Sequence, residues 1–161
     1  MVDNFGRVSQ YAGRTVDVLA FSGAKLSGDT LLSQELVSAN NSGLLIAGVE
    51  KLVNRFLIEL LTEKGSLDYA MDRGSFFMTQ LRLGLVRTTA DLFYEFSVAE
   101  LDVRGQLQGE ELPTDPDDER YAGSSMLSSS LLGDTMTLSV NVLSRAGTSR
   151  NVIFPITFSN I

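Results

Sequence analysis

The feature that most constrains the fold is a pair of alternating runs near the end of the sequence. Apolar and polar side chains alternate over residues 136–143 and again over residues 152–158, which is the period of a β-strand with one buried face. The residues between them, Arg145 to Thr148, have the composition of a turn. We therefore predict an antiparallel hairpin, and a weaker strand around Ser125–Leu132. The buried face of the hairpin would hold Met136, Leu138, Val140, Val142, Val152, Phe154, Ile156 and Phe158.

Three segments upstream of these strands have the period of amphipathic helices. The strongest spans residues 49–61, with a start cap at Asn41 or Ser42 and a stop at Gly65. A second helix is predicted over about Ser75–Leu85. We expect the first helix to bury Val49, Leu52, Val53, Phe56, Leu57, Leu60 and Leu61. We expect its solvent face to carry Glu50, Lys51, Asn54, Arg55 and Glu59.

The third helix has a start signal at Thr88, followed three residues later by Asp91, a capping box with Asp in place of Glu. Gly105 or Gly109 is expected to end it. Helices that precede strands in this way indicate an α+β fold, with amphipathic helices packed on one face of a small antiparallel sheet that ends in a C-terminal hairpin.

The chain divides into a domain and an extension. Residues 44–161 are predicted to form the α+β domain, and residues 1–43 an N-terminal arm, or a strand plus a loop. Thr15–Phe21 has the composition of a strand. Residues 22–43 are rich in Gly, Ser and Asn and are predicted to be loop, with a short helical turn at Leu31–Leu36.

Composition excludes several classes of function. The chain has no cysteine and no histidine, which removes disulfides, thiolate catalysis, Cys-based zinc sites and a Ser-His-Asp triad. A formal net charge of −7 disfavours wide contact with nucleic-acid phosphates. No apolar run approaches the roughly 20 residues of a membrane helix, and Met1–Tyr11 lacks a secretory signal pattern. We expect a soluble protein made in a cytoplasm, with no cofactor and no nucleic-acid or membrane partner.

The acidic residues permit two sharper interpretations, and neither is favoured. Glu59 and Glu63 lie one helical turn apart, a spacing that a glycosidase could use for its paired carboxylates. Nothing in the sequence indicates the difference in burial that separates the pKa values of such a pair. A solvated helix end is the simpler interpretation, and we expect no enzymatic activity.

A calcium site is the second possibility. The Pro- and acid-rich connection over residues 110–119 carries oxygen ligands of the kind that calcium prefers. It lacks the glycine and the regular spacing of an EF-hand loop, so we expect a solvated connection without a bound metal. The candidate ligands are Asp115, Asp117, Asp118 and Glu119.

An ordered set of short motifs resembles one family. The stretch from Phe56 to Gly65 is similar to the amphipathic helix and "LLT-x-x-G" turn of the baseplate wedge and sheath-initiator family of contractile phage tails, some members of which carry a lysozyme-like label. The segment from Tyr69 to Gly74 resembles the segment that leads into the second helix in that family. Ser149 to Ile156 resembles its closing strand, in which Asn precedes apolar residues, an aromatic residue and Pro. The resemblance covers about residues 44–161 and implies the same order of helices and strands.

The resemblance also implies partners and contact residues. A Glu-Pro-Arg signature precedes the hairpin in that family and docks onto other wedge subunits. The nearest match here is Asp118-Glu119-Arg120, which lacks the proline, so Glu119 and Arg120 are candidate docking residues. The family's C-terminal strands join a sheet with arms of the sheath protein. The partners implied are the tail sheath protein, baseplate wedge proteins and the tail tube, around a sixfold assembly.

Pro155 supports a similar expectation on physical grounds alone. Proline cannot donate a ladder hydrogen bond, so we predict that the last strand lies at a sheet edge, where another chain could add a strand. Its outward-facing residues, the candidate partner-binding set, are Asn151, Ile153, Pro155 and Thr157.

Together these observations predict a structural subunit of a contractile phage tail baseplate. It would be located in the virion tail, after assembly in the host cytoplasm, and would template the first sheath ring by strand addition. Two alternatives stay open: a carboxylate-dependent cell-wall hydrolase, and a tail-completion adaptor in a non-contractile particle.

Overall fold

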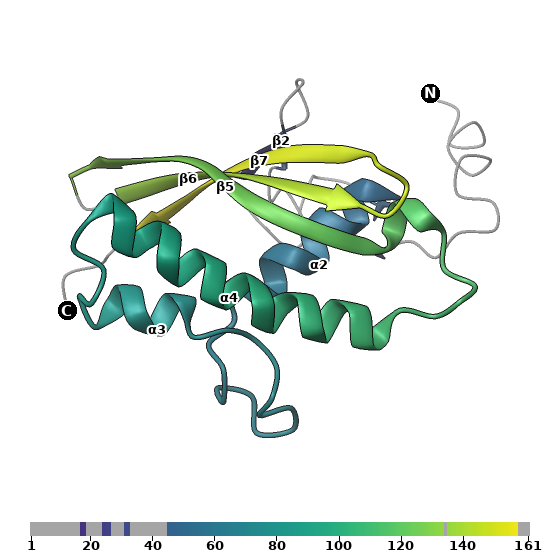
Figure 1. Ribbon diagram of the computed structural model, residues 1–161, viewed down its shortest axis with the longest axis horizontal. Helices are drawn as coiled ribbons and strands as arrows, with labels where there is room; N and C mark the ends of the chain where they lie inside the picture. The colour runs from purple at the N-terminus through teal and green to yellow at the C-terminus, as the bar shows by residue number, and fades with distance from the viewer. Residues whose placement is uncertain (1–16, 19–23, 27–30, 33–44, 134, 158–161) are drawn as a thin grey trace, which may run out of the picture.

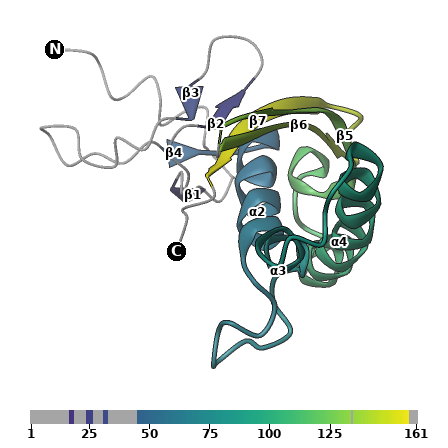
Figure 2. The ribbon, with the colours of Figure 1, turned by 90° about the vertical axis from the view of Figure 1, so that its left-hand side faces the viewer.

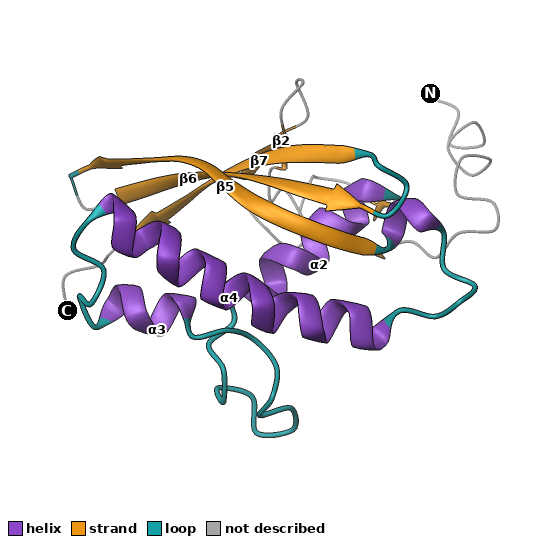
Figure 3. Ribbon diagram, viewed as in Figure 1, coloured by secondary structure: helices purple, strands orange, loops and turns teal. Residues whose placement is uncertain are grey.

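The predicted α+β class is confirmed. The computed structural model describes residues 17–18, 24–26, 31–32, 45–133 and 135–157. Figure 1 shows the helices lying together under one face of the sheet, and Figure 3 shows the same separation of helices and strands. The helices are α2 (Val49–Leu61), α3 (Phe77–Arg82), α4 (Thr89–Glu110) and the short 3-10 helix η1 (Asp117–Glu119). The strands are β1 (Asp17–Val18), β2 (Ala24–Leu26), β3 (Leu31–Leu32), β4 (Leu45–Ile46), β5 (Tyr121–Leu132), β6 (Thr135–Ser144) and β7 (Ser149–Thr157).

The main sheet is antiparallel, with strand order β3-β2-β7-β6-β5. The predicted hairpin is its centre: β6 and β7 pair in one uninterrupted register that places Leu138 opposite Phe154. The weak strand predicted over 125–132 is the longer β5, which begins at Tyr121. The short strands β1 and β4 form a separate two-stranded sheet.

The core lies between this sheet and the helices. The alternating apolar residues of β6 and β7 are buried and belong to the same core cluster as the apolar sides of α2 and α4. Figure 2 shows these two helices side by side beneath the sheet. Phe56 of α2 is fully buried and lies between two other rings: Tyr121, stacked at 5.9 Å between ring centroids, and Phe96, at 6.5 Å. Phe77 of α3 packs edge-on against Phe96 at 6.1 Å. These contacts join all three helices to the first residue of β5.

The start of α4 is the capping box predicted from sequence. The Thr88 hydroxyl accepts a hydrogen bond from the Asp91 backbone N–H, and the Asp91 carboxylate accepts from the Thr88 N–H at 2.9 Å. Hydrogen bonding to the Thr88 side chain, and to the backbone of Arg87 and Thr88, lowers the pKa of Asp91. The helix then passes Gly105 and Gly109 and ends at Glu110.

Several predicted boundaries are wrong. Helix α3 covers Phe77–Arg82 rather than Ser75–Leu85, so Leu85 lies outside the helix, and its side chain is exposed. The helical turn predicted at Leu31–Leu36 is replaced at Leu31–Leu32 by strand β3. The N-cap of α2 is Gly48. The caps predicted at Asn41 and Ser42, and the inward position predicted for Phe158, lie outside the described residues.

Candidate partner-binding surfaces

The C-terminal strand presents its predicted residues on the open face of the sheet. In β7, Val152, Phe154 and Ile156 are buried against the helices, and the residues between them point the other way. Ile153 is 40% exposed, and Pro155 and Thr157 are exposed. Asn151 is partly buried and accepts a hydrogen bond from the Asn141 side-chain amide. The predicted set therefore shares one accessible face.

The prediction that β7 is an edge strand is wrong. Strand β2 pairs with its outer side, with Lys25 opposite Ile153 and Leu26 opposite Val152. The error arose because residues 24–26 lie in a stretch whose composition indicates loop, while their partner is more than 120 positions away. Pro155 faces Thr137 in the β6 ladder without a register shift. The missing N–H donor of Pro155 therefore lies on the side of β7 that faces β2.

Glu119 is buried inside the molecule, although it was expected in a solvated connection, and it does not face outward as a docking carboxylate would. Its side chain is 4% exposed. One carboxylate oxygen accepts from the backbone N–H of Gly48 at 3.0 Å, and the other pairs with Lys51 Nζ at 2.8 Å. Because Gly48 and Lys51 form the start of α2, Glu119 places a negative charge at a helix N-terminus, where it is stabilising.

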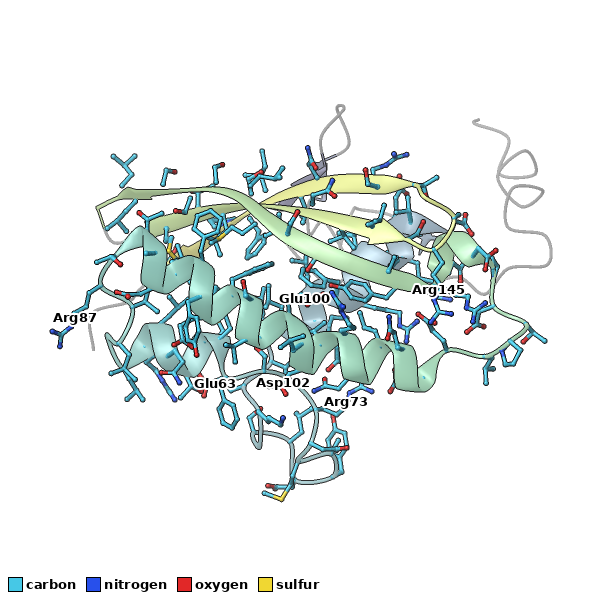
Figure 4. All side chains as sticks on the ribbon, in the orientation of Figure 1. Glu63, Arg73, Arg87, Glu100, Asp102 and Arg145 are labelled. Atoms are coloured by element: carbon cyan, nitrogen blue, oxygen red, sulfur yellow. The ribbon has the colours of Figure 1, made fainter. Side chains whose placement is uncertain are left out.

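Arg120 belongs to a second internal cluster, around Glu111. The Glu111 side chain, expected in solvent, is 3% exposed and accepts from the Tyr121 backbone N–H. Its other oxygen lies 2.8 Å from Arg145 Nη2 and 3.5 Å from Arg120 Nε. Arg120 also pairs with Asp117 at 3.3 Å. Figure 4 shows Arg145 at the end of the domain where this cluster lies. The motif that resembles the docking signature thus ties the connection to the fold.

This geometry predicts a stability role for Glu119. Glu119→Ala should lower the free energy of unfolding by about 2–4 kcal/mol, because it leaves the buried Gly48 N–H without its acceptor and removes the ion pair with Lys51. Glu119→Gln should lose less, since the amide oxygen can still accept from Gly48. Asp117→Ala is the control: its carboxylate is 68% exposed, and its loss should be at most about 0.5–1 kcal/mol. Urea denaturation measures all three. Equal, small losses of unfolding free energy in all three variants would mean that Glu119 does not stabilise the fold, and it would again be a candidate docking residue.

The carboxylates of the hydrolase alternative are held by arginines. Glu59, expected on the solvent face of α2, is 3% exposed; it pairs with Arg73 and accepts from the Gly74 N–H at 3.2 Å. Glu63 pairs with Arg82 at 2.9 Å. Figure 4 shows Glu63 and Arg73 at the two sides of the same loop base. Each acid has its own cationic partner, so the two do not face a shared reaction site.

The loop over residues 62–76 is closed at its base by polar contacts to α4. The Gln106 side chain accepts from the Gly74 N–H at 3.0 Å and donates to the Gly74 carbonyl at 2.8 Å. Lys64 pairs with Asp102 at 3.1 Å. Between this loop and α4 lies a groove of about 430 Å³. Its lining includes Lys64, Asp72, Arg73, Leu101, Asp102, Gly105, Gln106, Gly109 and Glu110.

Sequence reasoning missed that β5 lies at one edge of the main sheet, whose other edge is β3. No described strand pairs with the outer side of β5. Its twelve residues include no charge and no proline, the devices that usually protect an edge. The outward backbone groups of Tyr121 are bound by Glu111 and Gln108. Beyond residue 124, Leu127, Leu131 and Leu132 are exposed. In the sequence, the uncharged, Ser- and Leu-rich composition of this strand could have indicated that it lies at an edge.

Other kinds of site find no support in the part of the chain that the structure describes. Within those residues no group of three or more acidic side chains is placed to hold a metal ion, and no helix has the length and apolarity to cross a membrane. Comparison of the chain with protein-family models, with curated proteins and with solved structures finds no match.

Proposed function

We propose that this protein is a structural subunit of a contractile phage tail baseplate that templates the first sheath ring by strand addition. The observation that carries the proposal is the open, uncharged edge of β5. A strand from a partner can extend the sheet there, because the backbone groups along Ser125–Leu132 need partners when an assembly buries them. The family resemblance of residues 44–161 supplies the identity of that partner, the sheath protein.

The location of the edge differs from the first expectation, and the physical reason is the β2–β7 contact. A strand that added to β7 would have to displace β2 from Val152 and Ile153. Addition to β5 displaces nothing in the described chain. Wedge proteins and the tail tube would then meet the helical side, away from the growing sheet.

The hydrolase alternative is less well supported. A retaining or inverting glycosidase needs two carboxyl groups that flank one bond, whereas Glu59 and Glu63 are paired separately with Arg73 and Arg82. The other alternative is an adaptor in a non-contractile particle, and such a protein could use the same β5 edge and helical side. A micrograph of the parent particle, with or without a contractile sheath, separates it from our proposal.

Charged substitutions at the two candidate edges test the templating mechanism. Ser130→Lys adds a charge to the exposed edge of β5 without touching the core, and it should abolish nucleation of an extended sheath on assembled baseplates, counted by electron microscopy. Ser139→Lys is the matched control, because Ser139 lies on the same open face but in the central strand β6. It should nucleate normally.

A second variant separates the two edges. Ile153→Asp alters β7 and should leave nucleation intact if β5 is the template. If only Ile153→Asp abolishes sheath nucleation, the template edge is β7, and the added strand displaces β2. Normal sheaths from both edge variants would mean that strand addition is not the mechanism.

A further inference from the structure

Helix α4 is apolar on both sides, although the described residues cover only one of them. Leu92, Phe96, Ala99, Val103 and Leu107 are buried in the core. On the opposite side Tyr94, Val98 and Leu101 are 67%, 42% and 64% exposed. Their spacing of four and three residues continues through Gly105 and Gly109, so all five lie along one line of the helix surface. We call this line the outer stripe.

Neither packing nor backbone conformation in the described part of the chain requires glycine at the two glycine positions of the outer stripe. A Cβ atom added at Gly105 or Gly109 would meet nothing within 4 Å, and neither residue has a positive φ. Glycine is a poor helix former, yet α4 continues through both positions. Glycine on a helix surface allows another backbone to approach closely, and α4 is open to such an approach at these two residues.

The outer stripe runs into the groove beside the loop over residues 62–76. Leu101, Gly105 and Gly109 form part of the groove lining, and Lys64 and Arg73 stand on its far wall. Figure 4 shows Asp102 and Arg73 on the side of α4 away from the sheet, whereas Glu100 points toward the sheet. The groove and the stripe therefore form one continuous surface, separate from the β5 edge.

Charge determines what kind of partner fits. Helix α4 contains five acidic residues and one basic residue, Arg104. Asp91 and Glu95 follow the border of the outer stripe beside Tyr94 and Val98, whereas Asp102 is paired with Lys64 of the neighbouring loop. A second copy of this chain would bring the same acidic border and a further net charge of −7, which disfavours self-association. A partner with positive charge along its own border is complementary.

We propose that the outer stripe binds an amphipathic helix of a partner protein whose apolar face is bordered by lysine and arginine. The helix would lie along α4, over Tyr94, Val98 and Leu101, and would come closest at the two glycines. This inference rests on the proposed function only for the identity of the partner, which would be another baseplate subunit. The recognition chemistry does not depend on sheath templating.

The test uses two synthetic helical peptides of about 20 residues, which match the ~30 Å length of α4. Both carry the same leucine and alanine stripe; one has a Lys/Arg border and the other a Glu border. Fluorescence anisotropy with the full chain should give an affinity at least about tenfold higher for the basic peptide. That affinity should fall as salt is added.

Variants of the chain locate the contact. Gly105→Leu should weaken binding of the basic peptide at least about tenfold, because a large side chain blocks the close approach, and Leu101→Ala should weaken it several-fold. Both sites are exposed, and circular dichroism should show an unchanged fold. Leu127→Ala, at an exposed leucine of β5, is the control and should leave the affinity unchanged.

Three results would overturn the inference. The first is equal binding of both peptides, or no binding of either. The second is an unchanged affinity in Gly105→Leu and Leu101→Ala. The third is a dimer of the free chain, seen by sedimentation velocity and abolished by Gly105→Leu. None of these bears on sheath nucleation by Ser130→Lys, so failure here is distinguishable from failure of the proposed function.

Discussion

Phe56→Ala should lower the free energy of unfolding by about 3–5 kcal/mol. The ring is fully buried at the point where α2, α4 and β5 meet, stacked on Tyr121 and tilted against Phe96. Truncation removes its buried apolar surface and leaves a cavity that two rigid rings cannot close. Chemical denaturation with urea measures the loss directly.

The control is the same substitution at an outward position. Phe93 lies on α4 and is 39% exposed, so Phe93→Ala should lose no more than about 1 kcal/mol. Glu59, an obvious surface control from sequence alone, is unsuitable because its carboxylate is buried against Arg73 and Gly74. Similar losses in Phe56→Ala and Phe93→Ala would mean that the core does not centre on α2.

Tyr121 shows how closely this core is coupled to polar contacts. Its hydroxyl donates to the Glu100 carboxylate at 2.9 Å, and Glu100 also pairs with Arg104 at 2.9 Å. Burial raises the pKa of the Tyr121 phenol. The raised pKa favours the neutral phenol, which can donate to Glu100, so the ring that supports Phe56 is held by its hydroxyl as well as by its backbone.

Periodicity predicted the parts of this fold that local sequence determines. The alternation around Leu138 and Phe154 predicted the hairpin and its buried face. The spacing around Phe56 predicted the apolar face of α2, and Thr88 with Asp91 predicted the start of α4. In each case the residues that decide the structure lie within one helical turn or one strand of each other, so a short window contains the information.

The buried acids could not be predicted in the same way. Glu111 and Glu119 look like solvent residues because the window around each is polar, and Glu59 looks like one because it falls on the expected polar side of the α2 pattern. Their burial depends on cations and backbone donors from other elements; for Glu119 and Gly48 the separation is 71 positions. The position of β2 beside β7 has the same origin. Pairing over long sequence distances decided the candidate site, and its first assignment to the β7 edge was therefore wrong.

Gly74→Ala should be among the most destabilising single substitutions in the chain, at about 3–5 kcal/mol. Gly74 has φ of +87°, and a Cβ there would lie 2.3 Å from the Thr62 carbonyl oxygen, which belongs to the backbone and cannot rotate away. That oxygen also accepts the Ser75 N–H at 2.9 Å. Relief of the clash must therefore break the contacts of the loop base, including the Gly74 hydrogen bonds to Glu59 and Gln106.

Gly65→Ala separates the steric contribution from the conformational one. Gly65 lies in the same loop with a similar φ of +82°, but a Cβ there would meet nothing within 4 Å. Its loss should be limited to the strain of a left-handed alanine, about 1–2 kcal/mol. Urea denaturation of both variants gives the difference, about 2–3 kcal/mol if the Thr62 contact is the cause. Equal losses would show that the loop base yields to the added methyl group, and that the contacts between Gly74 and α4 do not hold the loop rigidly beside the outer stripe.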